Sequence, residues 1–471
     1  VGQFDLITRT AKLNAQLHAD QLNIITGRND VSADSLQTRA HADDGREKPQ
    51  LAIDASALGG MYAGAIRLIG TEQGVGVRLA GDMASTAGDI VINANGGLSL
   101  AHTTSVGALN ATAASIELQG PTFAAGDVDL QAKGDLVVQH TLASAGNVHL
   151  QAATVSNQGK VVSGIQEDQR IAGKQLRITA ERLDNQGELN ASGHLDIKTA
   201  VVDNSGNIAA DSAEIEARQQ INNSGQIVTA RELSLSAQQV NNQSGTLHTE
   251  GHLNLIADAV SNSGKTVAAG NITLAANTFD NSGELLSDGD LQLTLDADLH
   301  NSGLIAVKGD ATLSARNLIQ NHGQILSGND IQLRVRDVLH NLGVLSAARH
   351  LQLNATQLNN DGSLGSQGSL LISANVANTG LLFSGGDLHI RGEHFSNLEG
   401  DVYSVGDFSF AAADGGQATS FRNLSGTVES EGNLHIKALE FENARTVLAL
   451  ERELVGGSIQ WVCGQHCDGD D

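Results

Sequence analysis

Short segments of alternating apolar and polar residues recur along most of the chain. In residues 251–255 the apolar positions are Leu253 and Leu255, and a polar residue separates them. The same pattern returns at 270–274 and at 289–293. Alternation with a period of two residues is typical of strands with one buried face. Because a glycine opens each segment, and Asn, Asp and Ser lie between segments, the pattern predicts short strands joined by tight corners.

A series of asparagines has a nearly fixed spacing of 18 to 20 residues, and most of them are followed two residues later by glycine. Its members are Asn185, Asn204, Asn223, Asn242, Asn262, Asn281, Asn301, Asn321, Asn341, Asn360 and Asn378. Such a period is typical of solenoids, in which each coil buries its apolar side chains only against neighbouring coils. Each repeat contains one asparagine and, about ten residues later, one alternating segment. We therefore expect a strand, a corner, a second strand and a second corner in every repeat.

The period and the alternation together predict an all-β fold. We expect a right-handed parallel β-helix, a solenoid of about 19–20 residues per coil, that forms an elongated rod with coils about 4.8 Å apart. A leucine-rich horseshoe has a different consensus, and the Gly-Gly-x-Gly-x-Asp motif of the calcium-binding nonapeptide helix is missing. We expect the asparagine side chains to form a hydrogen-bonded ladder in the corners, and the following glycines to adopt positive φ.

Two steps of the repeat are longer than the others. Asn157 and Asn185 are 28 residues apart, with 162–170 as the extra segment. The step from Asn397 to the next asparagine is also long and contains 413–417. Insertions into a solenoid are expected to emerge as surface loops, which bind a partner in some proteins and are neutral length variation in most.

Composition supports a narrow coil rather than a globular core. The chain has 471 residues, of which only 3% are aromatic, whereas a globular core of this size normally uses more Phe, Tyr and Trp. The net charge is −25 and is spread along the chain. This charge argues against nucleic acid or an anionic membrane surface as a partner. The sequence predicts no cofactor.

The two cysteines lie close together near the C-terminal end. In an extracellular protein Cys463 and Cys467 predict a small disulfide loop. The alternative is half of a metal site with His466 as a third ligand. The lack of other thiols suits export, because no disulfide has to form or be reduced before translocation. Trp461 lies beside this segment, and the Asn-x-Gly pattern ends before it, so 446–471 is predicted to begin another domain.

The N-terminal end carries no recognisable signal peptide, and the chain has no apolar stretch typical of a membrane helix. It starts at Val1, without methionine and in the middle of the pattern. We therefore expect the chain to be a fragment or a processed piece of a longer protein.

Two regions resemble a known family. Residues 51–78 resemble the end of the secretion domain of two-partner-secretion exoproteins, and 24–29 resembles the strand before it. The Leu-x-Asn-x-Gly repeats that follow resemble filamentous-haemagglutinin repeats. Over about 1–445 the chain is thus similar to the filamentous haemagglutinin and contact-dependent growth inhibition effector (CdiA-like) exoproteins. One departure is Leu79, which stands where the family has the first residue of Asn-Ala-Gly.

The resemblance implies three regions. Residues 1–110 would be the C-terminal part of the secretion domain, 111–445 the repeat β-helix, and 446–471 the start of a following domain, with a receptor-binding region as one identity. It also implies a secreted, cell-surface protein of a Gram-negative bacterium, exported by an outer-membrane two-partner-secretion transporter. Its function would be that of a non-catalytic, monomeric stalk, which extends a distal receptor-binding and toxin portion toward a receptor on the target cell.

Two other functions remain possible for such a rod. One is an adhesin, whose rod faces bind glycan or protein directly. The other is a polysaccharide lyase, because parallel β-helices also support that chemistry, which requires paired acidic groups on one face. Asp43 and Asp44 are the clear internal acidic pair, and the polar segment 41–49 around them is typical of a solvated hairpin loop. The recurring Gly-Asp pairs, such as Gly309-Asp310, are interpreted as corner residues.

Histidine spacing does not predict a metal site. His248 and His252, and likewise His389 and His394, are near neighbours in sequence. A spacing of four brings two ligands together on a helix, whereas these residues lie in predicted strands and corners. Outward-facing polar positions are the simpler interpretation.

Overall fold

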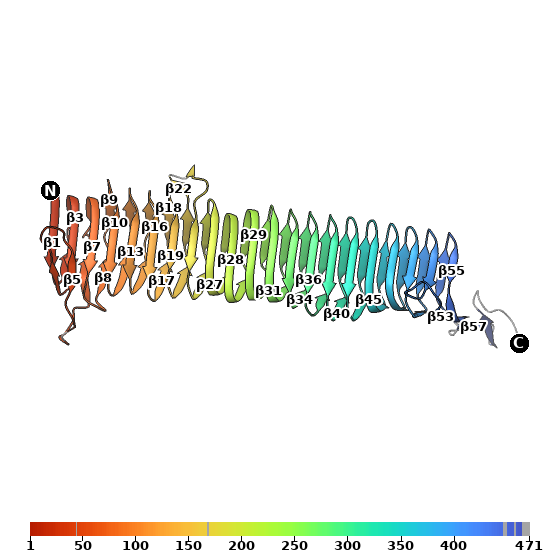
Figure 1. Ribbon diagram of the computed structural model, residues 1–471. Coiled ribbons are helices and arrows are strands. Elements are labelled where there is room, and N and C mark those ends of the chain that lie inside the picture. The colour runs from red at the N-terminus through yellow and green to blue at the C-terminus, as the bar shows by residue number, and fades with distance from the viewer. Residues whose placement is uncertain (44, 167–168, 446–449, 456–457, 464–471) are drawn as a thin grey trace. The chain divides into compact units, whose positions relative to one another are not determined.

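The computed structural model describes residues 1–43, 45–166, 169–445, 450–455 and 458–463. These residues form strands, turns and bends, so the predicted all-β class is confirmed. No helix that could cross a membrane occurs among them. The chain divides into two units: 1–276 with 283–286, and 277–282 with 287–471. Within each unit the strands of successive coils stack in parallel, which confirms the predicted solenoid (Figure 1).

A regular coil contains three strands, so the prediction of two strands per repeat is wrong. One coil of the first unit comprises β10 (Ile90–Ala94), β11 (Gly97–Leu100) and β12 (Thr103–Ser105), and the next comprises β13 (Leu109–Ala113), β14 (Ser115–Leu118) and β15 (Thr122–Ala124). All three pairings between these coils are parallel. We call the three faces the first, second and third sides, in chain order. Most separate strands of the third side have only three or four residues, which is too short for alternation to be recognised in the sequence.

Equivalent residues stack on one another along each unit and form the core. On the first side of the second unit, β36 (Leu291–Leu295) pairs with β39 (Ala311–Ala315), which pairs with β42 (Ile331–Val335). Their central leucines, Leu293, Leu313 and Leu333, lie in register and are buried. Each such side chain contributes about 1.5–3 kcal/mol by leaving water. The inward stack of aliphatic residues therefore supplies the stability that a globular protein would obtain from one central core.

The glycine after each asparagine has a steric role, and the predicted positive φ is wrong. In the described residues the glycines with positive φ are Gly27, Gly45, Gly74, Gly164, Gly173 and Gly415, and none of them follows an asparagine of the series. A Cβ at Gly225 would lie 2.0 Å from the carbonyl oxygen of Gly206, and one at Gly343 would lie 2.0 Å from that of Gly323. The backbones of successive coils thus approach too closely here for any side chain.

Three corners contain one more residue between the asparagine and the glycine. The residue before the glycine is then Ser244, Glu399 or Ser425, with φ of 59°, 56° and 54°. The left-handed backbone that the sequence suggested for glycine therefore occurs at these polar residues, where it absorbs the extra length of chain.

Two surface hairpins interrupt the solenoid, and only the first of them lies in a segment that the sequence predicts as a loop. Residues in the first long step form β22 (Ile165–Gln166) and β23 (Gln169–Arg170), an antiparallel pair outside the coils (Figure 1). Near the N-terminal end, β4 (Asn29–Val31) and β5 (Thr38–Ala40) form another antiparallel pair. The segment 413–417 is a tight turn, in which the Gly415 N–H donates to the Ala412 carbonyl oxygen at 2.9 Å.

Candidate functional site

The asparagines of the series are the last residues of second-side strands and point into the solenoid. In the first unit these strands include β20 (Thr154–Asn157) and β25 (Arg182–Asn185). The Asn157 Nδ2 donates to the Asn185 Oδ1 at 2.7 Å, and the Asn185 Nδ2 donates to the Asn204 Oδ1 at 2.7 Å. Both asparagines at the start of this chain of bonds are fully buried. The sequence predicted these residues in corners, whereas they end strands and are buried in the core.

The side-chain Nδ2 of an asparagine in the ladder donates hydrogen bonds to two acceptors in the following coil. Besides its bond to the Asn223 Oδ1 at 2.8 Å, the Asn204 Nδ2 donates to the backbone carbonyl oxygen of Gln226 at 3.1 Å. Further Nδ2-to-Oδ1 bonds link Asn223 to Asn242, Asn242 to Asn262, Asn281 to Asn301, Asn301 to Asn321, Asn321 to Asn341, Asn341 to Asn360, Asn360 to Asn378, Asn378 to Asn397, Asn397 to Asn423, and Asn423 to Asn443. Each unit thus contains a directional ladder that runs from the N-terminal to the C-terminal side.

The first ladder begins abruptly at Asn157. The equivalent residue of the preceding coil is Val138, and before it Leu118. Because neither side chain offers a donor, the Asn157 Oδ1 is buried and has no hydrogen-bond partner among the described residues. Leu79, the departure noted in the sequence, lies in the same column opposite Leu100. The column is therefore aliphatic in the early coils and polar from Asn157 onward.

Aspartates form a second, outer ladder at the corners before first-side strands. In the second unit the Asp310 Oδ1 accepts the N–H of Asp330 at 3.2 Å, and the Asp330 Oδ1 accepts that of His350 at 3.0 Å. The Asp407 Oδ1 likewise accepts the N–H of Asn433 at 2.8 Å, and this bond holds the pKa of Asp407 below its usual range. The Gly-Asp pairs are thus corner residues that also bond one coil to the next.

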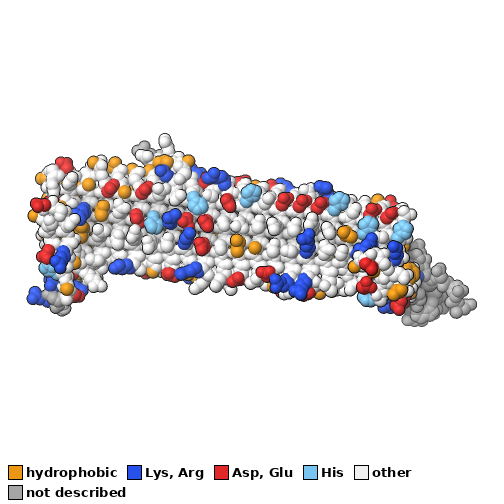
Figure 2. Space-filling model, in the orientation of Figure 1, with side chains coloured by type: hydrophobic (Ala, Val, Ile, Leu, Met, Phe, Trp, Pro, Cys, Tyr) orange, Lys and Arg blue, Asp and Glu red, His pale blue; other side chains and the backbone are white. Residues whose placement is uncertain are grey.

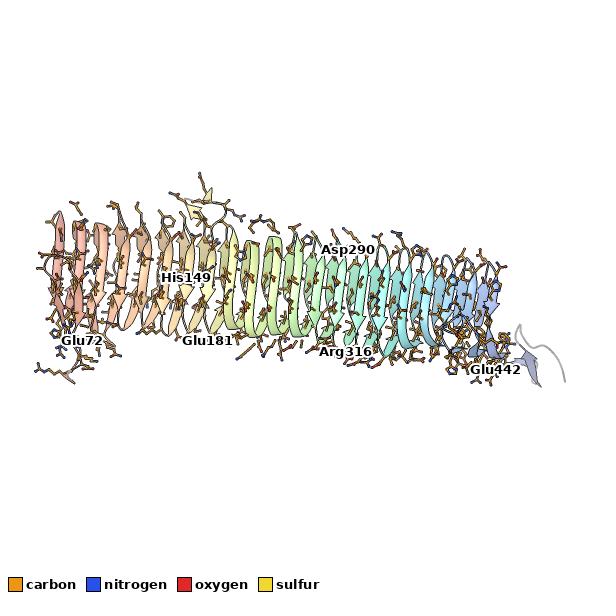
Figure 3. The ribbon with its side chains drawn as sticks, viewed as in Figure 1. Glu72, His149, Glu181, Asp290, Arg316 and Glu442 are labelled. Atoms are coloured by element: carbon orange, nitrogen blue, oxygen red, sulfur yellow. The ribbon has the colours of Figure 1, made fainter. Side chains whose placement is uncertain are left out.

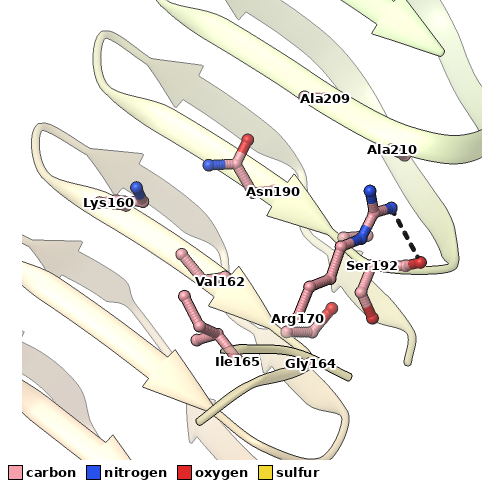
Figure 4. Close-up of a pocket in the computed structure, with 11 residues that line it drawn as sticks. Lys160, Val162, Gly164, Ile165, Arg170, Asn190, Ser192, Ala209 and Ala210 are labelled. Carbon is pink, nitrogen blue, oxygen red and sulfur yellow. Dashed lines mark hydrogen bonds between the residues drawn. The ribbon is translucent and has the colours of Figure 1, made fainter. Parts of the chain in front are cut away.

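A pocket of about 280 Å³ lies between the inserted hairpin and the third side of the first unit (Figure 4). Its strands are β21 (Lys160–Ser163), β26 (Glu188–Ala191) and the start of β28 (Asn207–Asn223). Arg170 extends over one end, and its guanidinium donates to the Ser192 carbonyl oxygen at 3.0 Å. The sequence indicated the insertion, but not the pocket, because the opposite wall comes from coils 20 to 50 residues further along the chain.

Charged side chains elsewhere lie mainly on the outside of the coils. His149, Glu181 and Arg316 project from the ribbon in Figure 3, and Figure 2 shows acidic and basic side chains interspersed on the visible face. Asp43 pairs with Lys48 at 2.6 Å, whereas Asp44 lies outside the described residues.

The histidines that suggested metal ligands have ordinary polar partners. The His389 Nδ1 is 2.7 Å from the Ser409 Oγ, and the His248 Nε2 is 2.8 Å from a Glu250 carboxylate oxygen. Within the described ranges no group of three or more His, Cys, Asp or Glu side chains could hold a metal ion.

The C-terminal segment leaves the parallel pattern. Here β57 (Leu450–Val455) and β58 (Ser458–Cys463) form an antiparallel pair. Cys467 and His466 lie outside the described residues, so the disulfide and its metal alternative both stay predictions.

Two family models match the chain. Residues 1–100 match a TPS secretion domain, and overlapping matches to a haemagglutinin repeat extend over 104–438. No solved structure matches.

Curated relatives match in parts of the chain. "Toxin CdiA" of Yersinia pestis is 56% identical over 92 residues, which are 20% of this chain and 3% of that protein. "tRNA nuclease CdiA" of Yersinia mollaretii is 33% identical over 230 residues, and "16S rRNA endonuclease CdiA" of Enterobacter cloacae is 31% identical over 245 residues. Each of these two matches covers 47% of this chain and 7% of the relative. The chain therefore spans only a small part of the length of these proteins.

Proposed function

The chain belongs to the haemagglutinin-repeat family, with a TPS secretion domain at its N-terminal side, and we propose that it is a non-catalytic stalk in contact-dependent growth inhibition. Such a stalk holds a distal receptor-binding and toxin portion away from the producing cell. The family is one of secreted, cell-surface exoproteins of Gram-negative bacteria. The secretion domain implies an outer-membrane transporter as the partner during export.

The observation that carries the proposal is the stacking of equivalent residues, coil upon coil, within each unit. The parallel strands and the two ladders of the described residues each bond a coil to the next coil. Such a chain can cross a narrow pore unfolded and then fold one coil at a time. Its length grows with the number of coils, which is the property that a stalk requires.

The remaining assignments follow from this function. Residues 1–110 would complete the export module, 111–445 would form the stalk, and 446–471 would begin the next domain. Receptor contact would then lie beyond this chain, and the stalk would act as a monomer. An enzyme active toward polysaccharide would instead release unsaturated products from polyuronates, and an assay with and without calcium distinguishes it from a stalk.

Length is the direct test. At about 4.8 Å per coil the isolated chain should have a maximum dimension of roughly 100 Å by small-angle X-ray scattering. In competition co-cultures, a parent exoprotein that lacks several whole coils should inhibit target cells less as the stalk shortens, while its secretion stays constant. A compact particle, or inhibition that is independent of coil number, would contradict the stalk.

A further inference from the structure

The last parallel coil of the second unit leaves its inward-facing apolar side chains uncovered. This coil consists of β54 (Thr427–Ser430), β55 (Leu434–Ile436) and β56 (Ala438–Ala444). Each strand pairs with the preceding coil, and no described strand pairs with its outer edge. Leu434 and Phe441 are 46% and 61% exposed, whereas the equivalent Phe408 and Phe421 of the preceding coil are 0% and 2% exposed. The end of the solenoid is therefore an apolar surface on which no described coil is stacked.

Two columns of side chains reach this surface with one partner missing. Phe395 stacks on Phe421 with ring centroids 4.7 Å apart, and Phe421 stacks on Phe441 at 5.6 Å. Phe441 thus has one ring face covered and the other exposed. The Asn443 Oδ1 accepts from the Asn423 Nδ2 at 2.9 Å, and no described group accepts from the Asn443 Nδ2. An occupant of this end should therefore offer aromatic or aliphatic side chains and a hydrogen-bond acceptor.

The β57–β58 hairpin has the residue pattern of such an occupant. Residues that lie opposite one another, or two positions apart, share one face of an antiparallel pair. By register, one face of this pair carries Leu450, Arg452, Leu454, Ile459, Trp461 and Cys463. Four of the six positions on the other face are polar: Glu451, Glu453, Ser458 and Gln460. One largely apolar face and one largely polar face are what the cap of a solenoid requires.

The short connection between β56 and β57 favours this hairpin over a second copy of the chain. Residues 446–449 lie outside the described residues, and a connection of this length spans at most roughly 20 Å even when it is extended. The tether gives the hairpin a high effective concentration at the end of the solenoid. A second copy would have to approach against the repulsion between two chains that each carry a net charge of −25.

We propose that the β57–β58 hairpin caps this end of the solenoid, with Trp461 against the exposed ring face of Phe441. An indole ring on Phe441 continues the aromatic column and removes further apolar surface from water. Arg452 is the one charged residue on the same face of the hairpin, and it would meet Glu440 on the exposed edge of β56. The cap prevents the uncovered coil from stacking on another copy, a role that goes beyond the stalk function.

Tryptophan fluorescence of the full chain tests the cap, because Trp461 is the only tryptophan. In the wild type its emission should lie at short wavelength and should resist quenching by acrylamide. Phe441→Asp should shift the emission to longer wavelength and remove the protection, because it places a carboxylate beneath the hairpin. Leu398→Asp is the matched control. It introduces the same group at a 43% exposed leucine of β50 (His394–Leu398), and it should leave the emission unchanged.

Circular dichroism of each variant shows whether the β-structure is intact. If Phe441→Asp disrupts the last coil, Leu434→Asp, in a different strand of the same surface, still decides the question by the same shift. The proposal is overturned if acrylamide quenches Trp461 freely in the wild type, or if the variants at Phe441 and Leu434 change the emission no more than Leu398→Asp does. End-to-end association of the wild type in size-exclusion chromatography would also overturn it, because a second copy would then cover the end. The length of the stalk is tested separately.

Discussion

At the scale of single residues, the effect of a substitution in the asparagine ladder depends on how many buried amide groups it leaves without a hydrogen-bond partner. An internal asparagine such as Asn204 accepts from one coil and donates to the next. Asn157 only donates, and its oxygen is already unpaired. The same substitution should therefore have different effects at these two positions.

Asn204→Leu should cost about 1–3 kcal/mol more than Asn157→Leu. Leucine has nearly the shape of asparagine, but at position 204 it leaves the buried Asn223 Oδ1 without its donor, which adds one unpaired acceptor. At position 157 leucine would continue the aliphatic column of Val138 and only move the unpaired oxygen to Asn185. Urea unfolding, supported by hydrogen exchange of the adjacent coils, measures the difference. Equal midpoints would show that the ladder bonds contribute nothing net.

Gly225→Ala should destabilise the first unit by about 1–3 kcal/mol or more. A methyl group there would lie 2.0 Å from the carbonyl oxygen of Gly206, so two coils must separate to accommodate it. Gln226→Ala, at the next and exposed position, is the matched control and should be close to neutral. If Gly225→Ala were equally well tolerated in thermal melts, close backbone approach would not explain the glycine.

Among the outer aspartates, Asp407 gives a pH dependence whose sign is fixed. The Asn433 N–H lowers the pKa of Asp407 in the folded state. A lowered pKa stabilises the fold at pH values above the ordinary carboxyl value, and this contribution disappears as the pH falls through the lowered value. Asp407→Asn keeps an oxygen acceptor, like Asn147, whose Oδ1 accepts the Gln175 N–H at 2.9 Å.

Wild type and Asp407→Asn should therefore melt alike near neutral pH. Below about pH 4, wild type should lose more stability than the variant. Thermal melts at closely spaced pH values measure this. If the variant lost as much stability in acid as the wild type, protonation of Asp407 would not be the cause of the loss.

At the scale of the strand, alternation decides which residues enter the core. In β31 (His252–Asn262) Leu253 is buried between Leu233 and Ile272, whereas Asn254 faces outward. The side chain of every second residue is thus stacked between two equivalent residues.

Leu253→Asp should cost several kcal/mol, because it buries a carboxylate without a partner. Asn254→Asp introduces the same group on the outside and should be nearly silent. Limited proteolysis of the two variants distinguishes the positions, with new cleavage expected near the first substitution only. Equal resistance would refute the strand assignment.

At the scale of the whole molecule, a solenoid should tolerate the removal of complete coils. Deletion of 321–340 brings Asn341 into the place of Asn321, so Asn301 gains an equivalent ladder partner and the aliphatic columns stay in register. The variant should still fold. It should lose the contribution of one coil to the free energy of unfolding and about 4.8 Å of length.

Deletion of 321–330 removes half a coil and is the control. It places first-side residues against second-side residues, so it should disrupt the second unit. Size-exclusion chromatography and circular dichroism distinguish the two deletions. If both folded equally well, the coils would not act as separate structural units.

The sequence alone determined the all-β class, the parallel solenoid, its period and the surface position of the long insert. These properties are repeated in every coil, so even a weak local signal becomes clear when it recurs at a fixed interval. It also located the asparagines, because a polar residue at constant spacing is visible without coordinates.

Only the tertiary structure decided how those residues are used. The third strand, the burial of the asparagines and the reason for the glycines depend on contacts between residues about 20 positions apart. The unpaired oxygen of Asn157 depends on Val138 in the previous coil, and the pocket forms because Arg170 of the hairpin lines the same space as Asn190 and Ala209 of later coils. Sequence periodicity predicts that coils stack. The distances between the backbones and side chains of neighbouring coils are set by the tertiary structure and cannot be read from the sequence.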